Sequence, residues 1–155
     1  MISINNIKRQ SFLVYGLGVT GQSVVKFFKK YNFENYCVWD DKDKSLFKSK
    51  RTKNLIKTLN EIDHIVLSPG VSLEKTKNKN GLKKFKNKII TDLDLVFLLK
   101  KFDKSIVVTG TNGKSTTCKI ISHVLKNNGY KPLLGGNIGT PILNLEIKKN
   151  NYLII

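Results

Sequence analysis

Short apolar runs alternate with helix-like segments along the whole chain. Most of these runs are rich in β-branched or aromatic residues and are bounded by polar or turn-forming residues, which is typical of strands. We expect strands at residues 11–15, 36–39, 64–67, 88–90, 105–108, 131–134 and 152–155. Strands that alternate with helices in this order predict an α/β fold with parallel sheets.

Helical periodicity separates several of the expected strands. Residues 22–31 place five apolar side chains on one helical stripe: Val24, Val25, Phe27, Phe28 and Tyr31. A second stripe, which ends at Gly129, consists of Ile120, Ile121, Val124 and Leu125. Residues 92–102 predict a further helix, whereas the lysine-rich segment 72–88 predicts a solvated loop with at most a short helix near Leu82 to Phe85.

One series of alternating strands and helices ends near residues 91–93, and another begins there. We therefore predict two domains. Residues 1–91 would form a Rossmann-like parallel-sheet domain, and residues 92–155 would form the start of a P-loop ATPase-type α/β domain.

A glycine-rich turn joins the first strand to the first helix. Gly16, Gly18 and Gly21 form the pattern G-x-G-x-x-G, in which a tight turn and a helix N-terminus let the backbone approach a phosphate. Asp40 and Asp41 follow the second strand, where such folds place an acid that accepts from a ribose or base. A turn without a ligand and solvated loop acids are the open alternatives. Alone, this half of the chain would suggest a nicotinamide or flavin enzyme.

The third strand ends in another turn, Ser68-Pro69-Gly70, at the carboxyl edge of the same sheet. Ligands of open α/β sheets bind at this edge. A plain strand-ending turn is the alternative.

A second loop, Gly110-Thr111-Asn112-Gly113-Lys114-Ser115, lies between a strand and a helix. It has the chemistry of a P-loop: amides that point at phosphate oxygens, a lysine for the β- and γ-phosphates, and a hydroxyl for Mg²⁺. A dehydrogenase has no need of this second phosphate-binding turn, and a simple nucleotide kinase has no need of the first.

Composition narrows the class of protein further. The 155 residues suffice for one ordinary domain or two small ones. The formal charge is +17, but only Arg9 and Arg51 are arginines and the lysines are spread along the chain, which disfavours a dedicated nucleic-acid partner. Cys37 and Cys118 are far apart in the sequence, so we expect a cytoplasmic protein. No apolar run approaches the roughly 18 residues of a membrane span, so we expect no membrane partner.

The motifs resemble those of the Mur ligases of peptidoglycan synthesis. "GTNGKST" (110–116) is similar to the ATP loop of that family, and "GLGVTGQS" (16–23), "SPGVSL" (68–73) and "GGNIGTP" (135–141) follow the order seen in its D-glutamate-adding member. The resemblance covers about residues 11 to 155.

The resemblance implies a role for each candidate residue. It implies that the first domain binds the UDP part of a UDP-sugar, through or near Gly18, Val19, Thr20, Asp40, Ser68, Pro69, Gly70 and Asn137. It implies that ATP is held by Gly110, Thr111, Asn112, Gly113, Lys114, Ser115 and Thr116, with Lys114 as the catalytic cation and Ser115 as a ligand of Mg²⁺. The family often has Thr-Arg where this chain has Asp41-Lys42, so a uracil contact by these two residues is not implied.

The reaction implied by the resemblance is an amide synthesis. ATP would convert the carboxylate of UDP-N-acetylmuramoyl-L-alanine into an acyl phosphate, which the amine of D-glutamate would attack. The full-length enzyme would act as a monomer. We expect the two loops near Gly18 and Lys114 to face a common cleft.

Ligases of this kind are about three domains long, so we expect this chain to be the N-terminal portion of one, inactive by itself. We also expect an unpaired edge strand near residues 152–155 and structural roles for His64 and His123. Two other functions stay open: a stand-alone nucleotide-binding module without catalysis, and a nicotinamide-dependent oxidoreductase, which the loop 110–115 disfavours.

Overall fold

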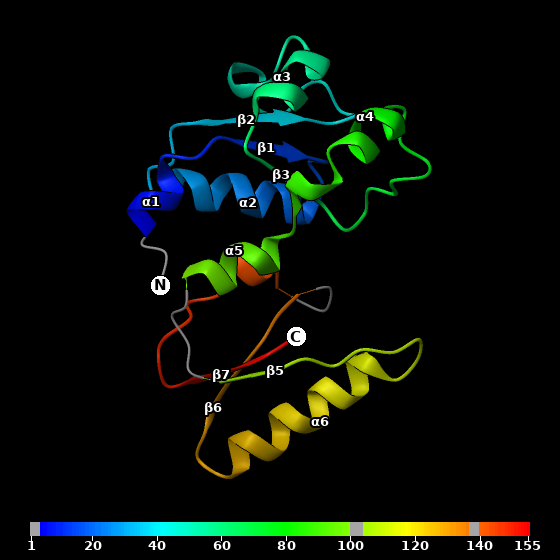
Figure 1. The fold of residues 1–155 in the computed structure, drawn as a ribbon. Coiled ribbons are helices and arrows are strands. Elements are labelled where there is room, and N and C mark those ends of the chain that lie inside the picture. The colour runs from blue at the N-terminus through cyan, green and yellow to red at the C-terminus, as the bar shows by residue number, and fades with distance from the viewer. Residues whose placement is uncertain (1–3, 100–103, 137–139) are drawn as a thin grey trace. The chain divides into compact units, whose positions relative to one another are not determined.

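The computed structural model describes residues 4–99, 104–136 and 140–155. It contains two compact units, Met1–Leu98 and Leu99–Ile155, each with a parallel β-sheet of its own (Figure 1). The predicted α/β class with parallel sheets is confirmed. The assignment of ligand-binding domains to residues 1–91 and 92–155 stays a prediction.

The sheet of the first unit has four parallel strands in the order β2-β1-β3-β4. Their bounds are β1 Phe12–Tyr15, β2 Tyr36–Trp39, β3 His64–Leu67 and β4 Ile89–Ile90. Strand β1 pairs with β2 on one side and with β3 on the other. The chain therefore reverses its direction across the sheet between β1 and β3, and ligands of open α/β sheets bind at the carboxyl ends of the strands at such a point.

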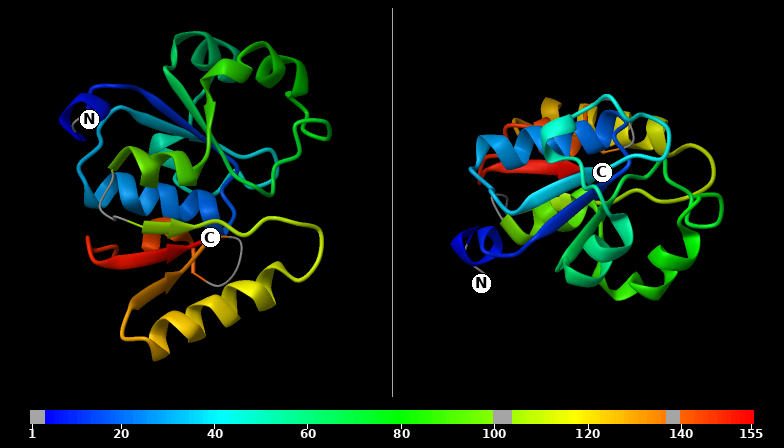
Figure 2. Two further views of the ribbon diagram at one scale, coloured as in Figure 1. Left: turned by 60° about the horizontal axis from the view of Figure 1, so that its bottom comes forward. Right: turned by 90° about the horizontal axis from the view of Figure 1, so that it is seen from above.

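The α-helices among the described residues of this unit are α1 Ile4–Lys8, α2 Val19–Lys30, α3 Leu55–Glu61, α4 Lys79–Lys84 and most of α5 Asp92–Leu99. Helix α2 covers one face of the sheet, and α3 and α4 cover the other (Figures 1 and 2). The sequence reading had not predicted α1 and α3. Helix α3 is capped by Asn54, whose side chain accepts a hydrogen bond from the amide of Lys57 at 3.0 Å.

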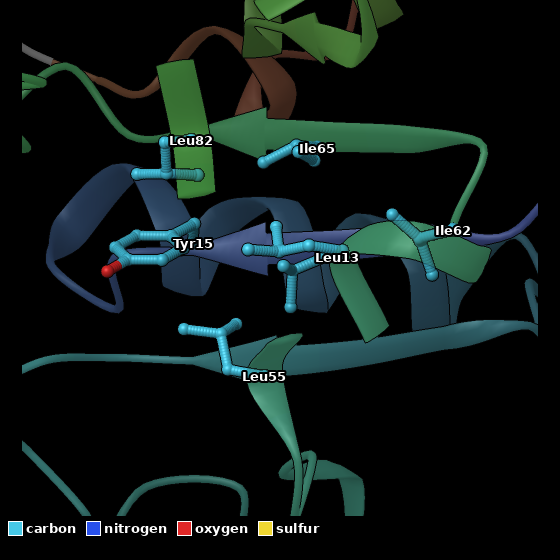
Figure 3. Close-up of a cluster of buried hydrophobic side chains, with 7 residues drawn as sticks. Leu13, Tyr15, Leu55, Ile62, Ile65 and Leu82 are labelled. Atoms are coloured by element: carbon cyan, nitrogen blue, oxygen red, sulfur yellow. The ribbon is translucent and has the colours of Figure 1, made fainter. Parts of the chain in front are cut away.

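The core fills both faces of strand β1, which explains why all four of its residues are buried. On the side of α3 and α4, the buried apolar cluster consists of Leu13, Tyr15, Leu55, Leu59, Ile62, Ile65 and Leu82 (Figure 3). Toward α2, the Phe12 and Phe28 rings pack with centroids 5.1 Å apart. The predicted stripe on α2 is confirmed, since Val24, Val25, Phe27 and Phe28 are buried and Tyr31 is half-buried.

The sheet of the second unit has the order β5-β7-β6, all parallel, with β5 Lys104–Ile106, β6 Lys131–Leu134 and β7 Asn151–Ile154. The expectation of an unpaired edge strand near residues 152–155 is wrong, because β7 is the central strand and Tyr152 pairs with both Lys104 and Pro132. Among the described strands of this sheet, β5 and β6 form the edges. Pro132 suits an edge strand because it lacks a backbone N–H.

Helix α6, Lys114–Asn127, packs beside β6, but its predicted apolar stripe divides into two. Cys118 is buried and Ile121 and Leu125 are half-buried, so this row faces the sheet. Ile120 and Val124 are 58% and 51% exposed. One row of the helix therefore contributes to the core and the other stays exposed in the part of the chain that the structure describes.

The two histidines have the structural positions that were expected. His64 begins β3, stacks on the Phe12 ring with centroids 5.3 Å apart, and bonds the Gln10 side chain at 2.9 Å. His123 lies on α6 and bonds the side chain of Asn127 at 3.0 Å. None of the helices among the described residues combines the length and the apolar character that a membrane crossing requires.

Candidate functional site

The glycine turn occupies the carboxyl end of β1, where the chain enters α2. Gly16 has a φ of +92°, and a Cβ on it would stand 2.5 Å from Cγ2 of Val71. A Cβ on Gly21 would stand 1.8 Å from the carbonyl oxygen of Gly16. The fold itself therefore requires glycine at both positions.

Gly18 differs from the other two glycines of the motif. Its φ is −65°, which any residue adopts, and a Cβ on it would meet no described atom within 4 Å. The protein interior thus gives no reason for a glycine here. The absence of a side chain instead leaves room on the outer side of the turn, where a ligand can approach the backbone.

Gly18 also caps α2 without any side-chain hydrogen bond to the helix. The first amides of an α-helix have no acceptor within the helix, and the helix dipole favours negative charge at this end. Val19, the first residue of α2, is 75% exposed, and Thr20 is half-buried. Gly18, Val19 and Thr20 therefore lie together at an open helix N-terminus that can receive a phosphate.

The turn after β3 lies against the glycine turn, as the switch between β1 and β3 requires. The Ser68 amide donates to the Tyr15 carbonyl at 3.0 Å, and its hydroxyl donates to the Gly16 carbonyl at 2.7 Å. Ser68 is buried, whereas Pro69 and Gly70 are exposed. The structure thus brings the predicted residues 68–70 beside Gly16, with Ser68 fixing the turn and the next two residues forming its surface.

Asp40 has a different environment from the solvated loop acid that was one alternative. Its carboxylate accepts hydrogen bonds from the backbone amides of Leu17 at 2.6 Å, Lys42 at 2.8 Å and Asp43 at 2.9 Å. Burial raises the pKa of Asp40, but these amides outweigh it and the pKa lies below its ordinary value. Asp40 therefore ties the loop after β2 to the glycine turn.

Arg51 also contacts the loop after β2, which the sequence did not predict. Its guanidinium donates to the carbonyl of Asp40 at 2.7 Å and to that of Asp43 at 2.9 Å. The same group lies over the Trp39 ring, 4.7 Å from the centroid. Arginine's planar fork suits this double role, and its two hydrogen bonds hold the backbone of the loop at Asp40 and Asp43.

Asp41 was expected only as a candidate acid beside Asp40, and in the structure it is the centre of a polar network. Its Oδ1 accepts from Tyr15 Oη at 2.8 Å, from Trp39 Nε1 at 3.0 Å and from Asn78 Nδ2 at 3.0 Å. Its Oδ2 accepts from Thr76 Oγ1 at 2.5 Å. Burial raises the pKa of Asp41, but these four donors outweigh it and lower the pKa below its ordinary value. No local sequence pattern predicts a network whose members come from three separate stretches of chain.

The loop at residues 110–115 lies in the second unit and opens α6. Gly110 and Gly113 have φ values of +145° and +78°, and Gly113 caps the helix without a side-chain hydrogen bond. The Lys114 ammonium donates to the carbonyls of Gly110 and Thr111. The amino group therefore lies over the loop, next to the first amides of a fourteen-residue helix.

This arrangement has the donors that a nucleotide phosphate needs. Ser115 and Thr116 lie on the first turn of α6 and are exposed, so their hydroxyls are accessible. Within the described ranges, no three His, Cys, Asp or Glu side chains lie together as a metal site. The roles of Lys114 toward ATP and of Ser115 toward Mg²⁺ stay predictions.

Two expectations concern features that the structure does not describe. Asn137 lies outside the described residues. The common cleft near Gly18 and Lys114 concerns the arrangement of the two units, and it too stays a prediction.

Comparison with known proteins places this geometry in a family. The model of the family described as "Mur ligase MurD-like, N-terminal domain" matches residues 10–90, which include the glycine turn, Asp40 and the turn after β3. These are the residues whose contacts build the site of the first unit.

Individual relatives agree with the family model. The chain is 38% identical to the UDP-N-acetylmuramoylalanine--D-glutamate ligase of Wolbachia pipientis wMel, over 99% of this chain and 31% of that protein. It is 39% identical to the proteins of the same name from Rickettsia prowazekii (strain Madrid E) and Francisella tularensis subsp. tularensis (strain WY96-3418), over 97% of this chain and 35% and 34% of theirs. The chain thus spans about a third of the length of these curated relatives.

A solved structure of UDP-N-acetylmuramate:L-alanyl-gamma-D-glutamyl-meso-diaminopimelate ligase from Neisseria meningitides is also similar, with a TM-score of 0.49 and 17% identity over 94% of this chain and 52% of that one. The family assignment rests on the sequence matches and not on this weaker likeness. The chain belongs to the Mur ligase family, and residues 10–90 form its MurD-like N-terminal domain.

Proposed function

We propose that the chain carries the UDP-sugar-binding and ATP-binding parts of a cytoplasmic ligase that adds D-glutamate to UDP-N-acetylmuramoyl-L-alanine in peptidoglycan synthesis. The observation that supports this most is the 38–39% identity to ligases of that name over nearly the whole chain. No second function is favoured by a specific feature of the described residues.

In the proposed site of the first unit, the diphosphate of the UDP-sugar lies on the N-terminus of α2. The free space outside Gly18 supports this placement, because a glycine there serves no need of the fold. Val19 and Thr20 would contact the same group, and the exposed Pro69 and Gly70 would border it. Asp40 would lie near the uracil as the residue that holds the surrounding loop in place, and Asn137 would reach the sugar-phosphate side.

In the proposed site of the second unit, the loop 110–116 holds the nucleotide. Lys114 would exchange its bonds to the loop carbonyls for the β- and γ-phosphates. The amides of Gly113 to Ser115 would bind the same anion. Ser115 would offer its hydroxyl to the metal. When bound, ATP and Mg²⁺ supply the phosphoryl group and the positive charge that turn a substrate carboxylate into an acyl phosphate for attack by D-glutamate.

Calorimetric titration of the purified chain with UDP-N-acetylmuramoyl-L-alanine, Mg-ATP and NAD tests the proposal. We expect the first two to bind and NAD not to bind. Lys114→Met should abolish ATP binding and leave the UDP-sugar affinity unchanged. Lys119→Met, an exposed lysine farther along α6, is the matched control and should change neither.

Other outcomes would contradict the proposal in different ways. NAD binding that depends on Gly18 would indicate a nicotinamide enzyme. ATP binding without UDP-sugar binding would indicate a nucleotide-binding module of another kind.

A further inference from the structure

Asp41 connects the carboxyl ends of β1 and β2 to the later part of the connection between β3 and α4. Its partners Tyr15 and Trp39 belong to β1 and β2, whereas Thr76 and Asn78 belong to the connection between β3 and α4. That connection begins at Ser68 and contains Pro69 and Gly70, the exposed turn of the candidate site.

The network is partly buried, and its members satisfy one another. Tyr15 is fully buried and Thr76 is 9% exposed, whereas Trp39, Asp41 and Asn78 are half-buried. Figure 3 shows the Tyr15 ring inside the apolar cluster, with its oxygen pointing away from the other labelled side chains. The hydroxyl lies 2.8 Å from Asp41 Oδ1, 2.9 Å from Thr76 Oγ1 and 2.9 Å from Asn78 Nδ2. A buried hydroxyl without such partners would be costly, so the cluster favours one geometry of the connection.

The connection between β3 and α4 is thus fixed at two points. At its start, Ser68 bonds the backbone of Tyr15 and Gly16. At its end, Thr76 and Asn78 bond Asp41. Between these points the backbone makes local turns, with the Thr76 amide donating to the Ser72 carbonyl at 3.0 Å.

The fixed connection determines what stands against the glycine turn. Val71 lies so close to Gly16 that a Cβ on Gly16 would be 2.5 Å from Val71 Cγ2. A shift of the connection would therefore move Val71 away from the glycine turn and Pro69 and Gly70 away from the N-terminus of α2.

We propose that Asp41 is a positioning residue for the UDP-sugar site: its carboxylate holds residues 69–78 so that Pro69 and Gly70 border the phosphate position beside Gly18. The proposal rests on the proposed function of the site for the identity of the ligand. The anchoring of the connection by Asp41 does not depend on that function, because the hydrogen bonds to Thr76 and Asn78 are present without a ligand.

The test compares Asp41→Asn with Asp63→Asn in the 155-residue chain. Asp63 is a matched control because its carboxylate also holds the first sheet, accepting from the Ser11 amide at 2.8 Å and the Ser11 hydroxyl at 2.7 Å. Ser11 precedes β1, so this contact lies at the opposite ends of the strands from the candidate site.

Two measurements are made on each variant. Hydrogen exchange of the free protein should be at least about tenfold faster at the amides of Val71, Lys75 and Thr76 in Asp41→Asn, while the amide of Gln22 in α2 keeps its protection. The calorimetric Kd for UDP-N-acetylmuramoyl-L-alanine should rise about tenfold in Asp41→Asn and stay within about twofold of the unmodified chain in Asp63→Asn.

Thr76→Val serves as a second variant if Asp41→Asn fails to fold, because it removes one partner and keeps the carboxylate. It should produce the same local acceleration and a smaller loss of affinity. Exchange that accelerates evenly over the first unit, or an unchanged Kd in a folded Asp41→Asn, would overturn the proposal. If the unmodified chain does not bind the UDP-sugar, the proposed function fails, and the exchange pattern alone then decides whether Asp41 anchors the connection.

Discussion

The carbonyl oxygen of Gly16 lies where a side chain on Gly21 would have to begin, 1.8 Å from the position of a Cβ. This close approach lets α2 start directly against the end of β1. Within one motif, the fold requires glycine at Gly21, whereas at Gly18 only the proposed ligand requires it. Alanine substitutions at the two positions should therefore have opposite effects.

Gly21→Ala should destabilise the protein by about 3 kcal/mol or more, because backbone atoms must move to relieve the clash. Gly18→Ala should cost about 1 kcal/mol or less, the usual effect of alanine at a helix N-cap, yet it should weaken UDP-sugar binding at least about tenfold. Denaturant unfolding and calorimetry on both variants check this. A Gly18→Ala protein with unchanged affinity would remove the phosphate from this turn.

Arg51→Lys should loosen the loop after β2. A lysine cannot bridge the carbonyls of Asp40 and Asp43 and also lie flat on Trp39, so we expect a loss of about 1–2 kcal/mol in unfolding free energy. Trp39 is the one tryptophan of the chain, and its fluorescence should change in the folded state. Arg9→Lys, the exposed control at the other arginine, should change neither quantity.

The Asp41 network should make the protein sensitive to acid in one direction. The pKa of Asp41 in the folded protein lies below the ordinary value of 3.8. The stabilisation by its ionised carboxylate is therefore complete above about pH 5 and is lost as the pH falls through this lowered pKa. At neutral pH, Asp41→Asn should cost about 2 kcal/mol. The Tm difference between the two proteins should shrink from pH 6 toward about pH 3, since all other carboxyls are common to both. A difference that grows in acid would contradict the assigned sign.

The exposed row on α6 should affect association more than folding. Ile120 and Val124 are one helical turn apart and more than half exposed, so replacing both with glutamate should leave the Tm nearly unchanged and reduce self-association in light scattering. Ile121→Glu is the contrasting control, because that side chain faces the sheet and its replacement should lower the Tm. Equal Tm losses in the two proteins would indicate that both rows are packed in solution.

The sequence predicted most of the fold because the strongest signals are local. All seven expected strands are present within one or two residues of their predicted ends, and α2, α5 and α6 occur where periodicity placed them. Helix α3 was missed although Asn54 offers a cap and Leu55, Leu59 and Ile62 have helical spacing. The pairing of β7 could not be predicted, since strand order depends on how the chain crosses over the sheet.

The same distinction between local signals and contacts formed by folding holds for the candidate site. The glycine turn, the turn at Ser68 and the lysine loop were predicted because each is a short motif. The roles of Arg51 and Asp41 were not, because their partners are close only after folding: Arg51 bonds Asp40 eleven residues away, and Asp41 bonds Asn78 thirty-seven residues away.

An amide NMR titration of the chain with UDP-N-acetylmuramoyl-L-alanine decides whether the UDP-sugar binds at the N-terminus of α2. We predict the largest shifts at Gly18, Val19, Thr20 and Gly70, with the amides of Ile121 and Leu125 unmoved. Saturating ligand that leaves the Gly18 and Val19 resonances in place, or that moves only the loop at residues 110–115, would contradict this prediction.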